Sequence, residues 1–180
     1  MNPLDILAKY YVPESELYRI LITHSRSVAD KALDIARKHP EMNLDLTFID
    51  EAAMLHDIGI FCCNAPDIDC HGEAEYICHG YLGAELMRKE GYLRHARVCE
   101  RHTGTGISEA MIEERNLPLP HRDFLPETME EQLICFADKF FSKTKLDKEK
   151  SVEKVKQGLS KYGNETVERF DNWCKLFLGE

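Results

Sequence analysis

The sequence lacks an apolar run of the roughly 18 residues that a membrane-spanning helix needs. Its first residues also lack a basic stretch followed by an apolar one, which is the pattern of a secretory signal peptide. From these two absences we expect a cytoplasmic protein with no membrane partner.

Positive charge is scarce, because 23 lysines and arginines face 32 aspartates and glutamates and leave a net charge of −9. Binding along a nucleic-acid duplex requires clustered basic side chains, so a broad nucleic-acid surface is not expected. A small phosphorylated substrate is not excluded, since bound divalent cations would add local positive charge that the formal count omits. The sequence does not determine the oligomeric state.

The seven cysteines include no Cys-x-x-Cys pair. Their odd number and the missing signal peptide favour reduced thiols over a disulfide framework. Cys62, Cys63, Cys70 and Cys78 gather near His71, so a structural zinc site is an alternative there, although less favoured than idle thiols.

Apolar residues recur at helical spacing along most of the chain, and capping residues punctuate the segments. There is no alternating strand pattern, internal repeat or linker, so we predict an all-α fold in a single domain, residues 1–180. Its metal-site core would span about residues 20–145, followed by terminal helices at about 151–178. Gly59 is expected to end one helix as a C-terminal glycine. The predicted helices are 2–10, 14–39, 45–56, 79–90, 93–102, 108–116, 128–141, 151–160 and 166–177.

Histidines and aspartates follow one another in a particular order within or beside these helices. Imidazole nitrogen suits mid-row transition metals, and a carboxylate can bridge two ions. His24 and Asp138 fall among apolar residues, where an unpaired charge is costly. A lone inward histidine is more often satisfied by a core hydrogen bond, but the whole set favours a metal site. The candidate ligands are His24, His56, Asp57, His79, His102 and Asp138.

That order, with the runs His56-Asp57-Ile58-Gly59 and Ala137-Asp138-Lys139, resembles the HD superfamily of metal-dependent phosphohydrolases. The resemblance covers about residues 24–138 and implies an HD-type helical bundle. It also implies one metal at His24, His56, Asp57 and Asp138, and a second at His79 and His102 with Asp57 as the bridge. Two divalent ions are expected, with Fe or Mn ahead of Zn, Ni, Co or Mg.

Some two-metal relatives have a His-His pair at the last histidine, whereas this chain has His102-Thr103, which would leave a coordination position open. The resemblance implies a phosphohydrolase in which a metal-bound hydroxide attacks phosphorus, with His56 and Asp57 as catalytic residues. The expected substrate is a phosphomonoester or phosphoanhydride, most simply a nucleotide, and more specifically a dinucleoside polyphosphate. Two alternatives remain: an HD-fold di-iron oxygenase acting on a small substrate, and a non-catalytic nucleotide-binding or regulatory domain.

Four further residues are predicted to bind substrate. Thr103 and Gly104 offer hydroxyl and backbone N–H groups beside His102, in a turn that either cradles a phosphate or simply stops a helix. Lys143 follows Asp138 closely and would reach a phosphate, unless it lies on a solvated face. Arg122 belongs to a proline-rich loop that would fold over the site.

Overall fold

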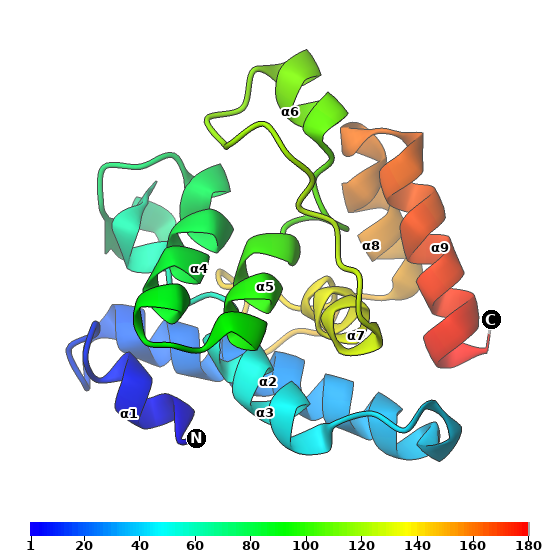
Figure 1. Ribbon diagram of the computed structural model, residues 1–180, viewed down its shortest axis with the longest axis horizontal. Helices are drawn as coiled ribbons and strands as arrows, with labels where there is room; N and C mark the ends of the chain where they lie inside the picture. The colour runs from blue at the N-terminus through cyan, green and yellow to red at the C-terminus, as the bar shows by residue number, and fades with distance from the viewer. Residues whose placement is uncertain (180) are drawn as a thin grey trace.

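The computed structural model describes residues 1–179 and confirms an all-α fold (Figure 1). Two short strands are the exception to the helical architecture. The elements are α1 (Pro3–Leu7), α2 (Glu16–Lys38), α3 (Leu46–Leu55), β1 (Asn64–Ala65), β2 (Cys70–His71), α4 (His79–Lys89), α5 (Leu93–Arg101), α6 (Glu109–Arg115), α7 (Met129–Asp138), α8 (Val152–Leu159) and α9 (Asn164–Leu178).

Polar side chains cap the starts of most helices, as the sequence predicts. In each case a side-chain oxygen accepts a hydrogen bond from a backbone N–H of the first turn, which would otherwise lack a partner. Thr128 and Glu131 bond reciprocally in a capping box at the start of α7. The helix that we expected to reach residue 141 ends earlier, at Asp138. The capping residues are Asn2, Ser15, Asp45, Ser108, Thr128 and Ser151.

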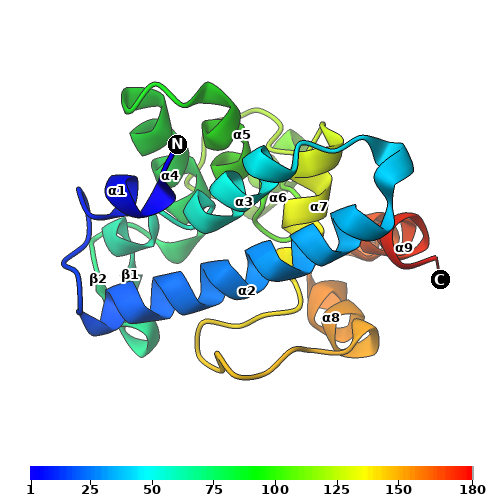
Figure 2. The same cartoon turned by 90° about the horizontal axis from the view of Figure 1, so that it is seen from below.

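The largest hydrophobic cluster joins α2, α3 and α7 to the two C-terminal helices. Phe136 of α7 is fully buried at its centre and lies against the rings of Phe140, Phe170 and Phe177. Figure 2 shows α2 running along the molecule, with the segment after α7 passing beneath it before α8. Packing in this core therefore fixes the position of α7 and of its last residue, Asp138.

Residues 60–78, which lie between two predicted helices, contain a small strand pair between 3₁₀ turns. β1 and β2 are antiparallel, with Asn64 opposite His71 and Ala65 opposite Cys70. Strands of two residues are too short to produce a visible alternation in the sequence. No disulfide joins cysteines within residues 1–179, and no group of potential metal ligands found there includes the cysteines of this segment.

The role predicted for Gly59 is wrong. Its φ of −86° and ψ of 0° are ordinary right-handed values, so Gly59 is not a left-handed cap. The space around it is what requires glycine, because a Cβ would lie 2.2 Å from the carbonyl oxygen of His79 and 2.4 Å from the nitrogen of Gly83. The backbone of α4 thus rests directly on Gly59, and this close approach sets the position of His79.

None of the helices described in residues 1–179 is long and apolar enough to cross a membrane.

Candidate metal centre

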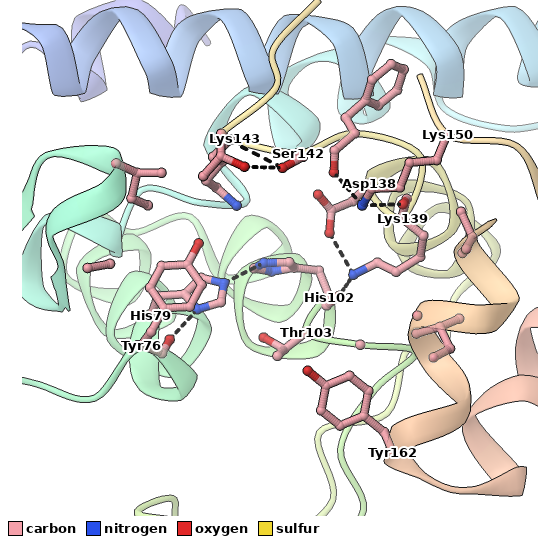
Figure 3. Close-up of a pocket in the computed structure, with 18 of the residues that line it drawn as sticks. Tyr76, His79, His102, Thr103, Asp138, Lys139, Ser142, Lys143, Lys150 and Tyr162 are labelled. Atoms are coloured by element: carbon pink, nitrogen blue, oxygen red, sulfur yellow. Dashed lines mark hydrogen bonds and ion pairs between the residues drawn. The ribbon is translucent and has the colours of Figure 1, made fainter. Parts of the chain in front are cut away.

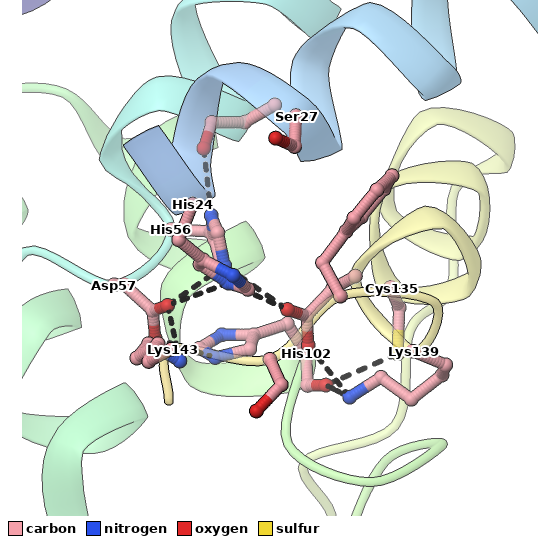
Figure 4. A network of polar contacts seen from close by, with 12 residues as sticks. His24, Ser27, His56, Asp57, His102, Cys135, Lys139 and Lys143 are labelled. Atoms are coloured by element: carbon pink, nitrogen blue, oxygen red, sulfur yellow. Dashed lines mark hydrogen bonds and ion pairs between the residues drawn. The ribbon is translucent and has the colours of Figure 1, made fainter. Parts of the chain in front are cut away.

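The six predicted ligands come together in the fold, and Figure 4 labels four of them, His24, His56, Asp57 and His102. All six are buried. His24 lies within α2, whereas the others stand where helices begin or end: His56 and Asp57 directly after α3, His79 as the first residue of α4, His102 directly after α5, and Asp138 as the last residue of α7. Helix packing therefore brings together residues that are up to 114 positions apart in the sequence.

Three of the histidines are oriented by the same local contact. Nδ1 of His56 lies 2.6 Å from the carbonyl oxygen of Ala53, and Nδ1 of His79 lies 2.6 Å from that of Tyr76. In His102 the corresponding distance, to Cys99, is 2.7 Å. A carbonyl oxygen only accepts hydrogen bonds, so Nδ1 of each ring donates the hydrogen. In the neutral ring Nε2 then has a free lone pair, as metal-binding histidines require.

The Nε2 atoms of these rings face the carboxylate of Asp57, and each oxygen of Asp57 lies near a different set of ligands. Oδ2 lies 3.0 Å from Nε2 of His56 and 3.2 Å from Nε2 of His24. Oδ1 lies 3.3 Å from Nε2 of both His79 and His102. Nε2 of His24 is also 3.0 Å from Oδ1 of Asp138. Asp57 therefore belongs to two ligand groups, one with His24, His56 and Asp138, the other with His79 and His102.

The ligand chemistry fits divalent cations. Nε2 of His79 and Nε2 of His102 lie only 3.0 Å apart although Nδ1 of each ring holds its hydrogen. Two lone pairs at this distance repel one another unless a cation lies between or beside them. Within the described chain, Oδ1 of Asp57 is buried and has no hydrogen-bond partner. Buried polar atoms are normally satisfied, so these atoms indicate that the chain folds around positive charge.

The charged groups shift one another's pKa strongly. Burial raises the pKa of Asp57, but His56 and Lys143 outweigh burial and hold it well below its ordinary value. Burial lowers the pKa of His56, but the charges of Asp57 and Asp138 reverse this effect and raise it to about 9. Burial lowers the pKa of His102 to about 4. His102 is therefore neutral at physiological pH, the form that binds metal.

Three of the ligands, His79, His102 and Asp138, line a cavity of about 640 Å³ whose wall is rich in lysine (Figure 3). Nζ of Lys143 lies 2.6 Å from Oδ2 of Asp57, and Nζ of Lys139 lies 2.7 Å from Oδ2 of Asp138. Asp67 and Asp138 are the acidic residues on the lining described in residues 1–179. The cavity is thus locally cationic in an acidic chain. Its lysines are Lys139, Lys143, Lys150, Lys154 and Lys161.

Three of the four residues that were predicted to bind substrate line the cavity, and one does not. Thr103, Gly104 and Lys143 line the cavity. Arg122 does not: its guanidinium group bonds Glu100 at 2.9 Å and lies over the ring of Phe124. The sequence located the loop of Arg122 but not its partner, because that ion pair forms only when the loop folds against α5. This geometry does not support Arg122 as a substrate ligand.

The pairing of Arg122 with Glu100 makes the stability of the fold dependent on pH. Glu100 is buried and also bonds Arg88 at 2.5 Å. Burial raises the pKa of Glu100, but the two arginines outweigh it and keep the pKa below its ordinary value. Because the folded-state pKa is lowered, this stabilisation is present above the unfolded pKa of about 4.3 and is lost as the pH falls through the folded value.

We therefore expect Glu100→Gln to lower the free energy of unfolding by about 1–3 kcal/mol at pH 7. The difference from wild type should shrink as the pH falls below about 4. Urea unfolding at pH 7 and at about pH 3 measures it, with exposed Glu114→Gln as the control. A deficit that is the same at these two pH values would show that the charge of Glu100 contributes nothing.

Several residues at the cavity carried no signal in the sequence. Four of them belong to the segment that follows α7, and they reach the cavity because α8 packs beside it: Lys150, Lys154, Lys161 and Tyr162. The ring of Tyr76 stacks on His79 with centroids 4.5 Å apart. Tyr76 was not predicted from the sequence, although it lies three residues before the predicted ligand His79.

A family model described as HD domain matches residues 21–143, so the chain belongs to the HD-domain family. This match confirms the resemblance found in the sequence. The chain has no match to a solved structure.

Curated relatives extend the comparison. A protein of Thermoplasma volcanium named tRNA (cytidine(56)-2'-O)-methyltransferase is 33% identical over 164 residues, which cover 90% of this chain and 41% of that protein. A protein of Picrophilus torridus with the same name is 32% identical over 171 residues, covering 89% of this chain and 44% of its own length. The chain thus spans less than half of these two relatives. An uncharacterized protein of Methanocaldococcus jannaschii is 33% identical over 129 residues, covering 69% of this chain and 68% of that protein.

The predicted phosphohydrolase function is contradicted by this comparison. The two relatives that carry a functional name are named for methyl transfer to tRNA and not for hydrolysis of a phosphate bond. The hydrolase class is wrong for the same reason. The physical cause of the error is that six metal ligands specify the ions that a site holds without specifying the reaction around them.

Proposed function

We propose that the chain is a metal-binding HD domain that takes part in the 2'-O-methylation of tRNA and binds a phosphate-bearing group at its metal centre. The observation that carries this proposal is a buried set of six nitrogen and oxygen ligands, three of which line a lysine-rich cavity of about 640 Å³. The link to tRNA methylation rests on the names of the two relatives. A cytoplasmic location, expected from the sequence, is part of the proposal.

The metal centre would hold two divalent ions. His24, His56, Asp57 and Asp138 would bind one, and His79 and His102 the other, with Asp57 between them. Mixed imidazole and carboxylate ligands suit Fe or Mn ahead of Mg, which prefers oxygen alone. Bound ions would draw phosphate oxygens toward the cavity, where the lysines add further positive charge.

Methyl transfer itself would belong to the part of the relatives that this chain does not match. The methyl donor of RNA methylation is a sulfonium cation, which a cavity lined with lysines repels. A smaller recess beside the cavity has a volume of about 150 Å³, well below the roughly 300 Å³ at which sites for drug-sized ligands begin. Neither space suits the donor, whereas the cationic cavity suits a phosphate group.

The part played in tRNA methylation can be tested in the source organism. Deleting the gene, or replacing it with the Asp57→Asn form, should lower 2'-O-methylation of tRNA cytidine, measured by mass spectrometry of tRNA digests. A chain that takes no part in methylation would leave the modification at the wild-type level in both strains, and this result would overturn the proposal.

Phosphate binding gives a prediction for the purified protein. Lys143→Gln should weaken binding of inorganic phosphate to the metal-loaded chain about tenfold or more, because one charge-assisted contact is lost. Calorimetric titration measures this, with metal content determined in parallel because Lys143 also contacts Asp57. Lys148→Gln is the matched control, since Lys148 is exposed on the same segment and outside the cavity lining. Equal phosphate affinity in the two variants would contradict a role for Lys143.

A further inference from the structure

A second, apolar recess adjoins the lysine-lined cavity. Its volume is about 150 Å³. The recess lies within a separate hydrophobic cluster, and its apolar wall is formed by Ile77, Ile107, Met111 and Leu117. None of these residues belongs to either ligand group, so the metal centre does not account for the recess.

The two spaces share part of their lining. Thr103, Gly104 and Tyr162 border both. In Figure 3, Thr103 and Tyr162 lie on the side of the cavity opposite Lys143. The turn at Thr103 leaves room, because a Cβ on Gly104 would meet nothing within 4 Å. The cavity and the recess therefore lie side by side at this turn.

The size and the border of the recess restrict that second group. A dry apolar cavity of about 150 Å³ holds a single benzene-sized ring, and the fused rings of a purine are larger. Tyr162 is 42% exposed at the mouth and offers a ring face for stacking. The guanidinium of Arg115 donates to the carbonyl oxygen of Tyr162 at 2.9 Å and lies 5.8 Å from the centre of its ring. The border thus combines an aromatic face with a polar donor, which suits a flat ring with polar edges.

We propose that this recess binds the pyrimidine ring of a nucleotide whose phosphate lies in the lysine-lined cavity. The inference rests on the proposed function, because it needs phosphate at the metal centre. Cytidine, the nucleoside to which the proposed function points, carries a one-ring base of this size. The recess would thus make the chain selective for pyrimidine over purine nucleotides, while the lysines and the metal centre supply affinity that does not depend on the base.

The test compares three ligands on the metal-loaded protein: inorganic phosphate, cytidine monophosphate and adenosine monophosphate. Calorimetric titration should show cytidine monophosphate binding about tenfold more tightly than phosphate, the effect of one stacked base. Adenosine monophosphate should bind no more tightly than phosphate. Equal affinity for the two nucleotides would overturn the inference.

Two variants locate the effect. Met111→Trp fills the recess and should cost about tenfold in affinity for cytidine monophosphate without changing that for phosphate, because Met111 lines the recess and not the cavity. Tyr162→Ala removes the stacking face and should reduce the preference for cytidine monophosphate over phosphate about tenfold. Val12→Trp is the control for the added indole, because Val12 is 73% exposed and outside both linings. Thermal unfolding checks that Tyr162→Ala and Met111→Trp are folded. If both folded variants bind cytidine monophosphate as tightly as the wild type, the pyrimidine ring does not lie in the recess and the inference is overturned.

The design separates failure of this inference from failure of the proposed function. Loss of the pyrimidine preference with phosphate binding retained overturns the recess alone, whereas absence of phosphate binding in the wild type overturns both. A competition with unmodified tRNA then identifies the source of the ring. Displacement of cytidine monophosphate by tRNA supports a cytidine residue of RNA as the natural ligand, and its retention supports a free nucleotide.

Discussion

Asp57→Asn should abolish binding at both metal positions, with affinity for Mn²⁺ falling by more than about 100-fold. Asp57 is the residue common to the two ligand groups, and its oxygens lie 3.0–3.3 Å from the ring nitrogens of all four histidines. Asparagine keeps the shape but removes the charge. Loss of a group that merely supports a ligand costs about 10- to 100-fold in metal affinity, so loss of a shared ligand should cost more.

Elemental analysis and calorimetric titration with Mn²⁺ measure this effect. Asparagine is preferred to alanine because it fills the buried space and avoids a cavity. Lys143 loses its ion-pair partner in the variant, but its side chain is 14% exposed and borders the cavity, so it can turn toward solvent. Asp67→Asn is the matched control on the cavity wall, outside both ligand groups. Full metal content in Asp57→Asn would rule out Asp57 as the shared ligand.

Gly59→Ala should destabilise the fold by about 3 kcal/mol or more and selectively weaken the second metal position. The added methyl group would overlap the backbone of α4, at 2.2 Å from the carbonyl oxygen of His79, and backbone cannot turn aside as a flexible side chain does. Overpacking of a core usually costs about 1–3 kcal/mol, and contact with backbone belongs at or above the upper end. Because α4 begins at His79, its displacement moves that ligand away from Asp57.

Urea unfolding and metal stoichiometry report the two parts of this prediction separately. Gly158→Ala is the matched control, because Gly158 lies within α8 with open space around it. That change should stabilise the helix by about 0.5–1 kcal/mol, since alanine loses less backbone entropy than glycine. Wild-type stability and metal content in Gly59→Ala would show that α3 and α4 do not depend on this close contact.

Local patterns in the sequence predicted the helices well because each helix depends on neighbouring residues. Asp45 and Thr128, the residues at which two helices were predicted to begin, each accept a hydrogen bond from the N–H group three positions further on, so local spacing reveals them. Helix ends were less predictable. The apolar pattern continues through Phe140 and Phe141, but the helix stops at Asp138. Apolar residues occur at these two positions because their side chains pack against neighbouring elements, and not because the helix continues.

Gly59 shows how one residue can be identified correctly and explained wrongly. Its place after a helix is typical of a left-handed cap, yet its φ is −86°. The requirement for glycine comes from α4, whose backbone approaches from a segment some 20 residues further along the chain. An approach of this kind depends on how two helices cross, and the local sequence does not encode it.

The sequence by itself determined the all-α class, most helix starts and the six residues that the structure brings together as candidate ligands. Their types and order carry that information, because histidine and aspartate among apolar residues are costly without a partner. The resemblance already implied which ligands share Asp57. Tertiary structure alone decided that Lys150, Lys154 and Lys161 line the cavity beside them, and that Arg122 pairs with Glu100 instead. These contacts join segments whose meeting depends on the packing of whole helices, and the spacing of residues along a chain does not record that packing.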